Sequence, residues 1–459
     1  MFVIFIKKVK SEGLSHNSYF VGSQNDAIVI DPRRDCHIFL DMAQQEEMTI
    51  KGIFETHRNE DYVIGSIELA KRTGAEIYHG SKLDFKYGQS LVDGQEISFG
   101  KVKLVALETP GHTDESMSYA LIDLDLSEKP IMVFTGDTLF VGDVGRTDLY
   151  GPDEAPRLAG ALYDSIFGKL LQLGDEVLIF PAHGAGSVCG GDISQREDST
   201  LGIEREFNPL LQKSRADFIA YKVNEHHTRP PYFLKMEKYN LEGPPLFNNF
   251  PSPPPLMPQA FLKQMKLGAI VVDTRQPVSF GGAYLKDTYS IWLERIPSYA
   301  GWTLPYDKPI LLILEDKIYL KKAVRYLYRL GYDNLTGYLI GGIEGWYKQS
   351  LPVEHFGLIS VQELRNCLSK EDDLFILDVR EDEKWKQGHI PGSFNIFSGY
   401  LEKRVDELPK NRKIVIVCNI GNRASLAASI LTRAGLRNVH NVLGGMIAWK
   451  NAGFEISTS

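Results

Sequence analysis

The sequence predicts a protein of several α/β domains, and three observations support this fold class. Short β-branched runs alternate with polar loops and helical stretches over residues 1–228. A proline-rich stretch follows at residues 229–257. Residues 258–355 and 356–459 then repeat one pattern of strands, helices and glycines. Because 459 residues are too many for one ordinary core, we expect about three domains and a linker.

Composition and charge narrow the function classes. The formal net charge is −8, and no block of lysines and arginines offers the basic surface that nucleic acid binding needs. The apolar opening at residues 1–6 is far shorter than the roughly 20 residues of a membrane span, so we expect a first β-strand there. The four cysteines show no paired spacing. We therefore predict a cytoplasmic protein with free thiols and without membrane or nucleic acid partners.

The β-branched runs of the first domain lie at residues 27–30, 102–105, 131–134 and 177–180. Acidic residues, glycine, proline or histidine follow them, so residues able to bind a ligand fall at strand ends. Proteins of this class usually place their chemistry on such loops, which a rigid sheet holds in position.

Prolines recur throughout residues 229–257, from Pro230-Pro231 to the run that ends at Pro255. Proline lacks a backbone donor and breaks both helix and sheet. We therefore predict a semi-rigid extended linker and a domain boundary at this segment.

The internal repeat pairs Asp273-Thr-Arg275 with Asp378-Val-Arg380, each at the end of an apolar run. It also pairs two Gly-Gly turns that lead to tryptophan, at residues 341–346 and 444–449. Strands alternate with helices in both copies, which predicts two α/β domains with parallel sheets covered on both faces.

The second copy carries a cysteine in a setting that favours chemistry. An apolar run at residues 413–417 leads to Cys418, and a helical stretch begins after Arg423. A thiol between a strand and a helix N-terminus lies among unpaired backbone N–H groups, which favours the nucleophilic thiolate. Gly421 lets the loop curl inward, and Arg423 adds a positive charge for an anion. An inert buried cysteine is the alternative.

This second copy resembles the rhodanese family of sulfurtransferases. The resemblance rests on residues 378–380, Gly388-His-Ile-Pro-Gly392, the loop 418–423 and the Gly-Gly turn that leads to Trp449. It implies that Cys418 accepts a sulfane sulfur and carries it as a persulfide. The sulfur-binding loop would comprise Asn419, Ile420, Gly421 and Asn422, with Arg423 as a second functional residue. Asn419 stands where many thiosulfate-using members have a basic residue, which leaves the sulfur donor open.

The first copy, residues 258–355, departs from this pattern. Leu314-Glu-Asp-Lys317 follows the strand where the cysteine would stand, and a carboxylate cannot take up sulfur. We predict a catalytically silent domain that serves packing and spacing.

The first domain carries a constellation of possible metal ligands. His57, His112, Asp137 and His183 lie in four separate loops, each after an apolar run, so we expect them at the same edge of a sheet. Any one of these histidines alone is better explained by an ordinary polar loop. Three histidines and an aspartate in such positions together indicate a metal site.

The order and spacing of these loops resemble the metallo-β-lactamase fold, an αββα sandwich. Residues 15–19, 30–33, 136–149 and 181–186 look like the persulfide dioxygenase branch of that fold. The fusion to two rhodanese-like domains, the first degenerate, is similar to bacterial persulfide dioxygenase-sulfurtransferases over the whole chain.

The ligand loop departs from the usual Thr-His-x-His-x-Asp-His, because Asn59 and Tyr62 replace its second and third histidines. This loss counts against a binuclear zinc hydrolase. In the persulfide dioxygenase branch, one iron is held by residues that correspond to His57, His112 and Asp137. Two histidines and one carboxylate leave three positions open, which is typical of non-haem Fe(II) that binds O₂ and a substrate.

The remaining polar residues of the constellation would then support the ligands. By resemblance, Asn59, Asp61 and His183 would orient ligands or bound water. Tyr62 would either donate a hydrogen bond to an anionic substrate or fill the volume of the lost imidazole.

The resemblance implies an enzyme with one Fe(II) per chain that uses O₂ to oxidise a low-molecular-weight persulfide to sulfite and thiol. Sulfur transfer through Cys418 could then yield thiosulfate. It also implies a homo-oligomer. Two alternatives stay open: a zinc-dependent hydrolase of the thioester type, and a domain without metal that serves as a scaffold for an active Cys418.

Overall fold

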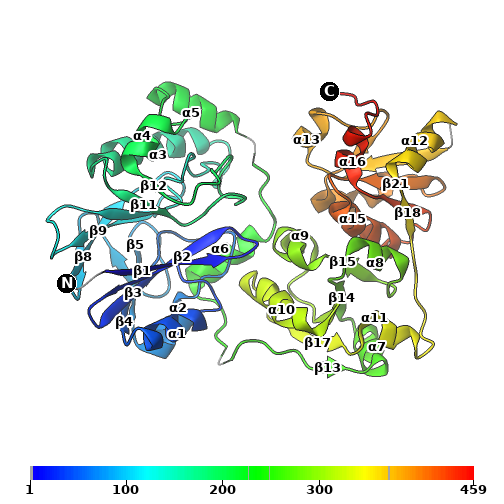
Figure 1. Cartoon of the computed structure of the whole chain (residues 1–459), viewed down its shortest axis with the longest axis horizontal. Helices are drawn as coiled ribbons and strands as arrows, with labels where there is room; N and C mark the ends of the chain where they lie inside the picture. Colours follow the sequence, from blue (N-terminus) through cyan, green and yellow to red (C-terminus); the bar gives the residue numbers. More distant parts are fainter. Residues whose placement is uncertain (1–3, 226, 248, 371–372, 459) are drawn as a thin grey trace. The chain divides into compact units, whose positions relative to one another are not determined.

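The computed structural model describes residues 4–225, 227–247, 249–370 and 373–458 (Figure 1). The chain divides into two compact units, Met1–Phe250 with Tyr328–Gly331, and Pro251–Leu327 with Tyr332–Ser459. The first strand, β1 (Phe5–Ser11), begins within the segment where a strand was expected, and residues 1–3 of that segment lie outside the described residues.

The first unit contains two six-stranded sheets. The first follows the sequence order: β1, β2 (His16–Ser23), β3 (Asp26–Ile30), β4 (Thr49–Phe54), β5 (Glu76–Gly80) and β6 (Gln89–Leu91). The second runs in reverse from β12 (Ser199–Thr200) through β11 (Leu178–Pro181), β10 (Met132–Gly136), β9 (Met117–Asp123) and β8 (Val102–Glu108) to β7 (Glu96–Phe99). Both sheets mix parallel and antiparallel pairs.

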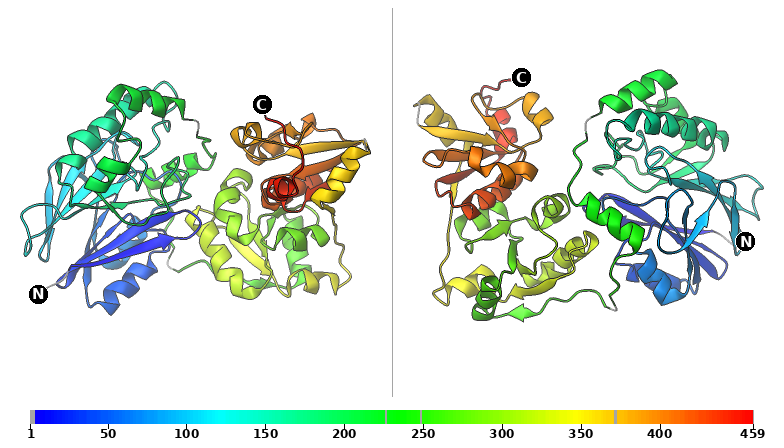
Figure 2. Two further views of the ribbon diagram at one scale, coloured as in Figure 1. Left: turned by 45° about the horizontal axis from the view of Figure 1, so that its top comes forward. Right: turned by 180° about the vertical axis from the view of Figure 1, so that it is seen from behind.

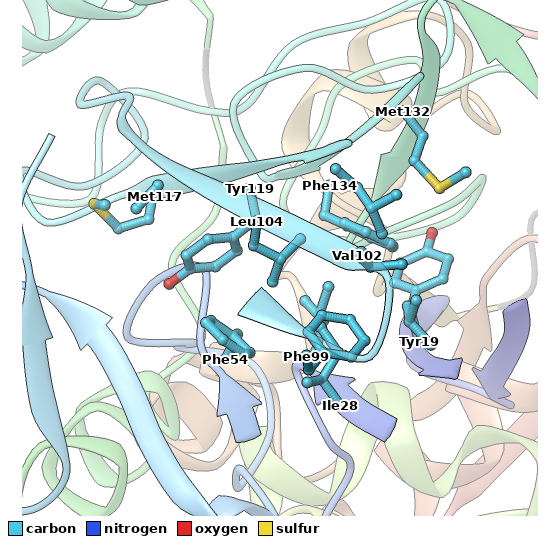
Figure 3. Packing of buried hydrophobic residues seen from close by; sticks show 14 of the residues in the cluster. Tyr19, Ile28, Phe54, Phe99, Val102, Leu104, Met117, Tyr119, Met132 and Phe134 are labelled. Atoms are coloured by element: carbon cyan, nitrogen blue, oxygen red, sulfur yellow. The ribbon is translucent and has the colours of Figure 1, made fainter. Parts of the chain in front are cut away.

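Strand alternation explains how each sheet buries both faces. Because successive side chains of a strand point to opposite faces, Tyr19 and Val21 of β2 enter the core between the sheets, whereas Phe20 enters a core on the outer face. The central core is rich in aromatic rings: Tyr19 packs against Phe134 with ring centroids 5.2 Å apart (Figure 3). Its tight packing holds the two sheets together at the ends where the ligand loops begin.

Helices cover the outer faces. On the first sheet, α1 (His37–Gln45) and α2 (Ser66–Thr73) bury Phe39 and Leu69. On the second, α3 (Ala155–Gly168) and α5 (Arg215–Asn224) bury Leu162 and Phe218, beside η1 (Leu170–Gln172) and α4 (Leu201–Phe207). The layers run helix, sheet, sheet, helix, which confirms the predicted αββα sandwich (Figure 1).

A helix lies where extended chain was predicted. Residues Phe233–Glu242 form α6, with Phe233 and Met236 buried, inside the segment predicted as a linker. Its flanking prolines explain the difference: Pro230-Pro231 precede the helix and Pro244-Pro245 follow it, so neither pair interrupts its hydrogen bonds. The prediction rested on the number of prolines in the whole segment. It overlooked that the ten residues of α6, between the two pairs, include no proline.

The second unit contains two five-stranded sheets of the same strand order. The first is β13 (Pro255–Leu256), β17 (Leu335–Leu339), β16 (Ile310–Ile313), β14 (Ile270–Asp273) and β15 (Thr288–Ser290). The second is β18 (Gly357–Ile359), β22 (Val439–Val442), β21 (Lys413–Val417), β19 (Leu374–Asp378) and β20 (Phe394–Asn395). All described pairs in both sheets are parallel, which confirms the predicted repeat of one α/β fold.

Helices pack on both sheets of this unit (Figure 2). The first copy has α7 (Pro258–Lys266), α8 (Pro277–Gly282), η2 (Leu293–Arg295), α9 (Ile296–Thr303), η3 (Lys317–Tyr319), α10 (Leu320–Arg329) and α11 (Gly342–Tyr347). The second has α12 (Val361–Ser369), α13 (Asp382–Lys386), η4 (Ser398–Tyr400), α14 (Leu401–Arg404), η5 (Val405–Glu407), α15 (Asn422–Arg433) and α16 (Gly445–Asn451). No helix in the described part of the chain is long and apolar enough to span a bilayer.

The two copies share one buried ion pair in addition to their topology. Arg380 Nη2 donates to Asp378 Oδ2 at 2.6 Å and to the carbonyl eight residues on, at Gly388, at 2.9 Å. Arg275 repeats both contacts, with Asp273 at 2.7 Å and with the carbonyl of Ala283 at 2.7 Å. Each pair fastens the strand end to the segment after the next helix, so the repeated Asp-x-Arg sequence has a structural role in both copies.

The copies also pack on each other through β15 and α15. Ser290 Oγ lies 2.8 Å from Ser425 Oγ, and the Ser290 amide donates to Ser429 Oγ at 3.1 Å. Trp302 meets Phe397 edge to face, with ring centroids 5.1 Å apart. These contacts bring α9 of the first copy near the cysteine loop of the second.

Candidate metal centre and sulfur-transfer loop

His57 follows β4, and a hydrogen bond at its Nδ1 atom orients the ring. Asp31, at the end of β3, accepts hydrogen bonds from the Thr56 amide and from Thr56 Oγ1, both at 2.8 Å. Because the Thr56 hydroxyl donates to Asp31, it accepts from His57 Nδ1, which lies 2.9 Å away. The Nε2 atom of His57 therefore carries a lone pair, and it is buried without a hydrogen-bond partner among the described residues.

His112 is oriented in a similar way. Its Nδ1 lies 2.9 Å from the carbonyl oxygen of Arg146, which can only accept, so Nδ1 carries a proton and Nε2 faces the cluster. Burial opposes a charge on the ring, but Glu60 and Asp137 outweigh it and raise the pKa of His112 to about 9, so a metal would replace a proton at Nε2. That Nε2 atom is also buried and has no hydrogen-bond partner in the described structure. In a metal-binding histidine, the ring nitrogen that does not bind the metal usually donates such a hydrogen bond. Both side chains therefore fit a divalent cation.

Asp137 completes the set at the end of β10. Its Oδ2 lies 3.8 Å from His57 Nε2 and 3.5 Å from His112 Nε2, and one ligand atom from each residue lies within 4.8 Å of the others. These are the three ligands that the sequence resemblance implied. Burial lowers the pKa of His57 to about 4, which keeps its imidazole neutral at physiological pH.

The four ligand-bearing loops come from two sheets, not from one edge of a single sheet. His57 follows β4 of the first sheet, whereas His112, Asp137 and His183 follow strands β8, β10 and β11 of the second. A sequence shows which strands end in polar loops, but not to which sheet each strand belongs. The site therefore lies where the ends of the stacked sheets meet.

His183 lies between two carboxylates. Its Nδ1 is 2.8 Å from Asp137 Oδ1, and its Nε2 is 3.1 Å from Asp61 Oδ2. Burial opposes a charge on the ring, but Asp137 and Asp61 outweigh it and raise the pKa of His183 well above 6.5. His183 thus orients the Asp137 carboxylate, and Asp61 orients His183.

Neither replacement for the lost histidines presents an imidazole. Asn59 Nδ2 donates to the backbone oxygen of His57 at 3.2 Å. Tyr62 is buried and stacks on His16, with ring centroids 3.9 Å apart. The Tyr62 hydroxyl has no hydrogen-bond partner among the described residues, so it fills space and keeps a donor available.

Two residues near the metal ligands were missed in the sequence. Glu60 is buried with Oε1 3.3 Å from His112 Nε2. Cys189 Sγ lies 3.5 Å from the same oxygen and forms a second cluster of possible ligands with Asp61 and His183. Glu60 occupies a variable position of the ligand loop, and Cys189 lies in a glycine-rich loop, so neither carried a signal of its own.

A cavity of about 260 Å³ opens beside the site. It is lined by His16 and His183, by the basic side chains of Lys8, Lys10 and Arg196, and by the acidic side chains of Glu12 and Glu197. Because Lys8 pairs with Asp198 and Lys10 with Glu197, the charges of this cavity are mixed.

Gly145 packs directly against two of the candidate metal ligands, His112 and Asp137. A Cβ atom at this position would lie 2.0 Å from the carbonyl oxygen of Asp137 and 3.2 Å from His112 Cβ. Gly145→Ala should therefore displace both residues and lower the bound metal to less than half of the wild-type content, measured by elemental analysis. Gly168→Ala, at the end of α3 with nothing within 4 Å, is the matched control and should keep full metal content. Equal metal content in both variants would contradict this packing argument.

The cysteine loop of the second copy lies between β21 and α15. Cys418 is buried, and the Gly421 amide donates to its Sγ at 3.0 Å. Gly421 has φ +101°, which favours glycine and allows the loop to turn its amide inward. The carbonyl of Cys418 accepts from the Met446 amide at 2.8 Å, so the Gly-Gly turn holds the loop from the other side.

The sequence suggested that Arg423 offers a positive charge to an anion. In the structure, this charge is already paired with a carboxylate. Its two Nη atoms donate to both oxygens of Glu381, at 2.6 and 2.7 Å. Burial opposes the charge, but Glu381 outweighs it and raises the pKa of the guanidinium. The guanidinium carbon also lies 5.3 Å from the centroid of the Phe397 ring. Arg423 therefore holds the wall of the site together as well as adding charge to it.

A cavity of about 440 Å³ exposes the cysteine loop, and both copies line it. The second copy contributes Cys418 with Asn419, Ile420, Asn422 and Arg423, together with Lys384. The first copy contributes Arg295 and Tyr299, from η2 and α9. The first copy, which the sequence predicted to serve packing and spacing, thus also lines this cavity.

Comparisons with known proteins match two separate parts of the chain to two different families. The Metallo-beta-lactamase superfamily matches residues 12–183, and the Rhodanese-like domain matches residues 360–452. A crystal structure of a metallo-beta-lactamase from Staphylococcus aureus is 31% identical, with a TM-score of 0.65, and the match covers 73% of this chain and 98% of that one.

Two curated relatives match the first domain. The mitochondrial persulfide dioxygenase ETHE1 of Bos taurus is 28% identical over 216 residues, which are 44% of this chain and 74% of that protein. A hydroxyacylglutathione hydrolase of Francisella philomiragia is 31% identical over 176 residues, 38% of this chain and 64% of that protein. The chain spans about half the length of several other curated relatives that it matches. The chain therefore belongs to the metallo-beta-lactamase superfamily and carries a rhodanese-like domain in its C-terminal part.

Proposed function

We propose that this protein is an iron-dependent persulfide dioxygenase joined to a sulfurtransferase. The observation that carries the proposal is the convergence of His57 Nε2, His112 Nε2 and Asp137 Oδ2, with both imidazoles oriented by hydrogen bonds at Nδ1. Two histidines and one carboxylate are the donor set of non-haem Fe(II) oxygenases. Similarity to ETHE1, a persulfide dioxygenase, supports a persulfide and O₂ as substrates.

The overall reaction adds three oxygen atoms to the outer sulfur. A persulfide RSSH, O₂ and water give RSH, sulfite and two protons, so the outer sulfur is oxidised and O₂ is reduced. Bound Fe(II) supplies the redox chemistry that brings these two substrates together.

Residues of this chain supply binding and orientation. The hydroxyl of Tyr62 offers a buried hydrogen bond to an anionic sulfur, because its own ring contact with His16 leaves that donor unused. Asp61 and His183 keep the Asp137 carboxylate in place.

Sulfite is then the natural acceptor for sulfur held on Cys418. The Cys418 persulfide gives its outer sulfur to sulfite, the S–S bond breaks, and thiosulfate and the Cys418 thiolate are formed. The Gly421 amide donates to the Sγ position and stabilises the leaving thiolate. Arg295 and Lys384 add positive charge to the cavity in which the dianion would bind.

The test identifies the products. Protein purified without oxygen is mixed with a low-molecular-weight persulfide and O₂, and sulfite and thiol are quantified against O₂ consumed. The proposal predicts one sulfite for each O₂. Hydrolysis of a thioester without O₂ consumption would establish the zinc hydrolase instead.

The Arg295 side chain gives this proposal a second test. Arg295→Ala removes one cation from the cavity and should raise the KM for sulfite in thiosulfate formation by roughly tenfold, with kcat changed less than threefold. Steady-state kinetics of the purified enzyme measure both constants. Arg437→Ala, a surface arginine paired with Glu354 outside the cavity, is the control. An unchanged KM for Arg295→Ala would show that the first copy takes no part in binding the acceptor.

A further inference from the structure

We propose that Glu60 is a fourth protein ligand of the metal, so that two imidazoles and two carboxylates hold the ion. This inference rests on the proposed iron site at His57, His112 and Asp137. It adds a residue that stands at a variable position of the ligand loop and that the family resemblance does not assign.

The atoms of Glu60 close a ring with the three expected ligands. Its Oε1 lies 3.3 Å from His112 Nε2, and its Oε2 lies 3.9 Å from His57 Nε2. Asp137 Oδ2 lies at comparable distances, 3.5 and 3.8 Å, from the same two nitrogens. Each imidazole nitrogen is therefore flanked by both carboxylates.

These separations suit ligands of one cation. Nitrogen and oxygen ligands lie about 2.1 Å from a divalent metal, which puts neighbouring ligand atoms about 3 to 3.6 Å apart. The four nitrogen-to-oxygen distances of the ring, 3.3 to 3.9 Å, need only slight contraction around an ion.

Burial favours a cation beside Glu60. The side chain is 1% exposed, Cys189 Sγ donates to its Oε1 at 3.5 Å, and its Oε2 has no hydrogen-bond partner within the described residues. A buried carboxylate needs positive charge and hydrogen bonds around it, and a metal ion would supply that charge at Oε2. The orphaned Nε2 atoms of His57 and His112 face the same position, and they would be satisfied by the same ion.

The ligand loop is held so that Glu60, and not its neighbour, enters the site. The Asn59 side chain donates to the His57 carbonyl, and the backbone carbonyl of Asn59 accepts from Asn240 Nδ2 at 2.7 Å. The Arg58 amide donates to Glu115 Oε1 at 3.1 Å. A carboxylate one residue later in the loop thus takes the place of the imidazole lost at Asn59.

A fourth ligand changes what the centre can accept. An ion with six positions keeps two open instead of three, and the two carboxylates balance its double positive charge. The centre would then admit one sulfur ligand and one molecule of O₂, without a spare position for water.

The test measures metal binding in the full-length protein, because Co(II) absorption reports the ligands independently of turnover. Metal-free protein is titrated with Co(II) against a chelator for the wild type, Glu60→Gln and Glu68→Gln. Glu60→Gln should weaken Co(II) binding at least tenfold and change the visible d–d absorption. Glu68→Gln, a buried glutamate of α2 that accepts from Arg72 and takes no part in holding the ligand loop, should leave both unchanged.

Thermal melting guards against a misfolded variant. Metal-free Glu60→Gln should unfold in one cooperative transition, and its melting temperature should rise less than that of the wild type when Co(II) is added.

Three results would overturn the proposal. Wild-type affinity and absorption in a folded Glu60→Gln protein would exclude Glu60 as a ligand while leaving the iron site intact. A sulfur-to-cobalt absorption band that disappears in Cys189→Ser would give the fourth position to Cys189. A wild type that takes up no Co(II) would refute both this inference and the proposed function.

Discussion

Replacing His57 by alanine abolishes persulfide-dependent O₂ consumption and leaves sulfur transfer at Cys418 intact. His57 is the ligand that Thr56 and Asp31 orient, and its Nε2 has no other use in the described structure. Without it, the proposed set keeps only one of its two imidazoles, and we expect at least a hundredfold loss of O₂ uptake together with loss of iron. An oxygen electrode and elemental analysis measure these effects.

The control for this variant is another buried histidine. The two ring nitrogens of His79 lie within hydrogen-bond distance of the carbonyl oxygens of Gly80 and Tyr87. The residue lies outside the ligand ring. His79→Gln should lower the melting temperature but keep the iron. Persistent O₂ consumption in His57→Ala would contradict the assignment of the metal site.

Replacing Cys418 by serine abolishes sulfur transfer and leaves O₂ consumption and iron content unchanged. Cys418 is the cysteine that receives an amide hydrogen bond at a strand–helix junction, and a serine hydroxyl cannot carry a sulfane sulfur. Sulfur transfer should fall below one hundredth of the wild-type rate in a thiosulfate-forming assay.

Cys367→Ser in the same domain should retain full sulfur transfer, since Cys367 lies on α12 and does not line the Cys418 cavity. Loss of both activities in Cys418→Ser would refute the proposed division of labour between the two halves of the chain.

A domain that serves only as a scaffold explains less of the structure. His57 Nε2, His112 Nε2 and Glu60 Oε2 are buried without hydrogen-bond partners among the described residues. A scaffold would be expected to replace such groups by apolar side chains, because unsatisfied buried polar atoms destabilise a fold. Asn59 and Tyr62, which replace two histidines of the usual ligand loop, lie outside this ring.

Much of the site could be predicted because its signals are local. His57, His112 and Asp137 each follow an apolar strand, and loops at strand ends bring distant residues together. The repeat in the C-terminal half was readable for a related reason. Asp273-x-Arg275 and Asp378-x-Arg380 form the same buried ion pair, so the same residues recur at the same positions.

Other features depend on packing that no local pattern reveals. Glu60 enters the site because hydrogen bonds from Asn240 and to Glu115 fix the backbone of its loop. Arg295 and Tyr299 reach the Cys418 cavity only because β15 packs on α15. Such long-range contacts decide which polar residues face a site and which face solvent.

Metal reconstitution of the wild type tests the central claim most directly. Protein purified without oxygen is analysed for metal, stripped with a chelator, and reloaded with Fe(II) or Zn(II) before O₂ uptake is measured with a low-molecular-weight persulfide. We predict one iron per chain and O₂ consumption that is lost on stripping and restored by Fe(II) but not by Zn(II). Bound zinc with no persulfide-dependent O₂ consumption in any metal form would contradict the account.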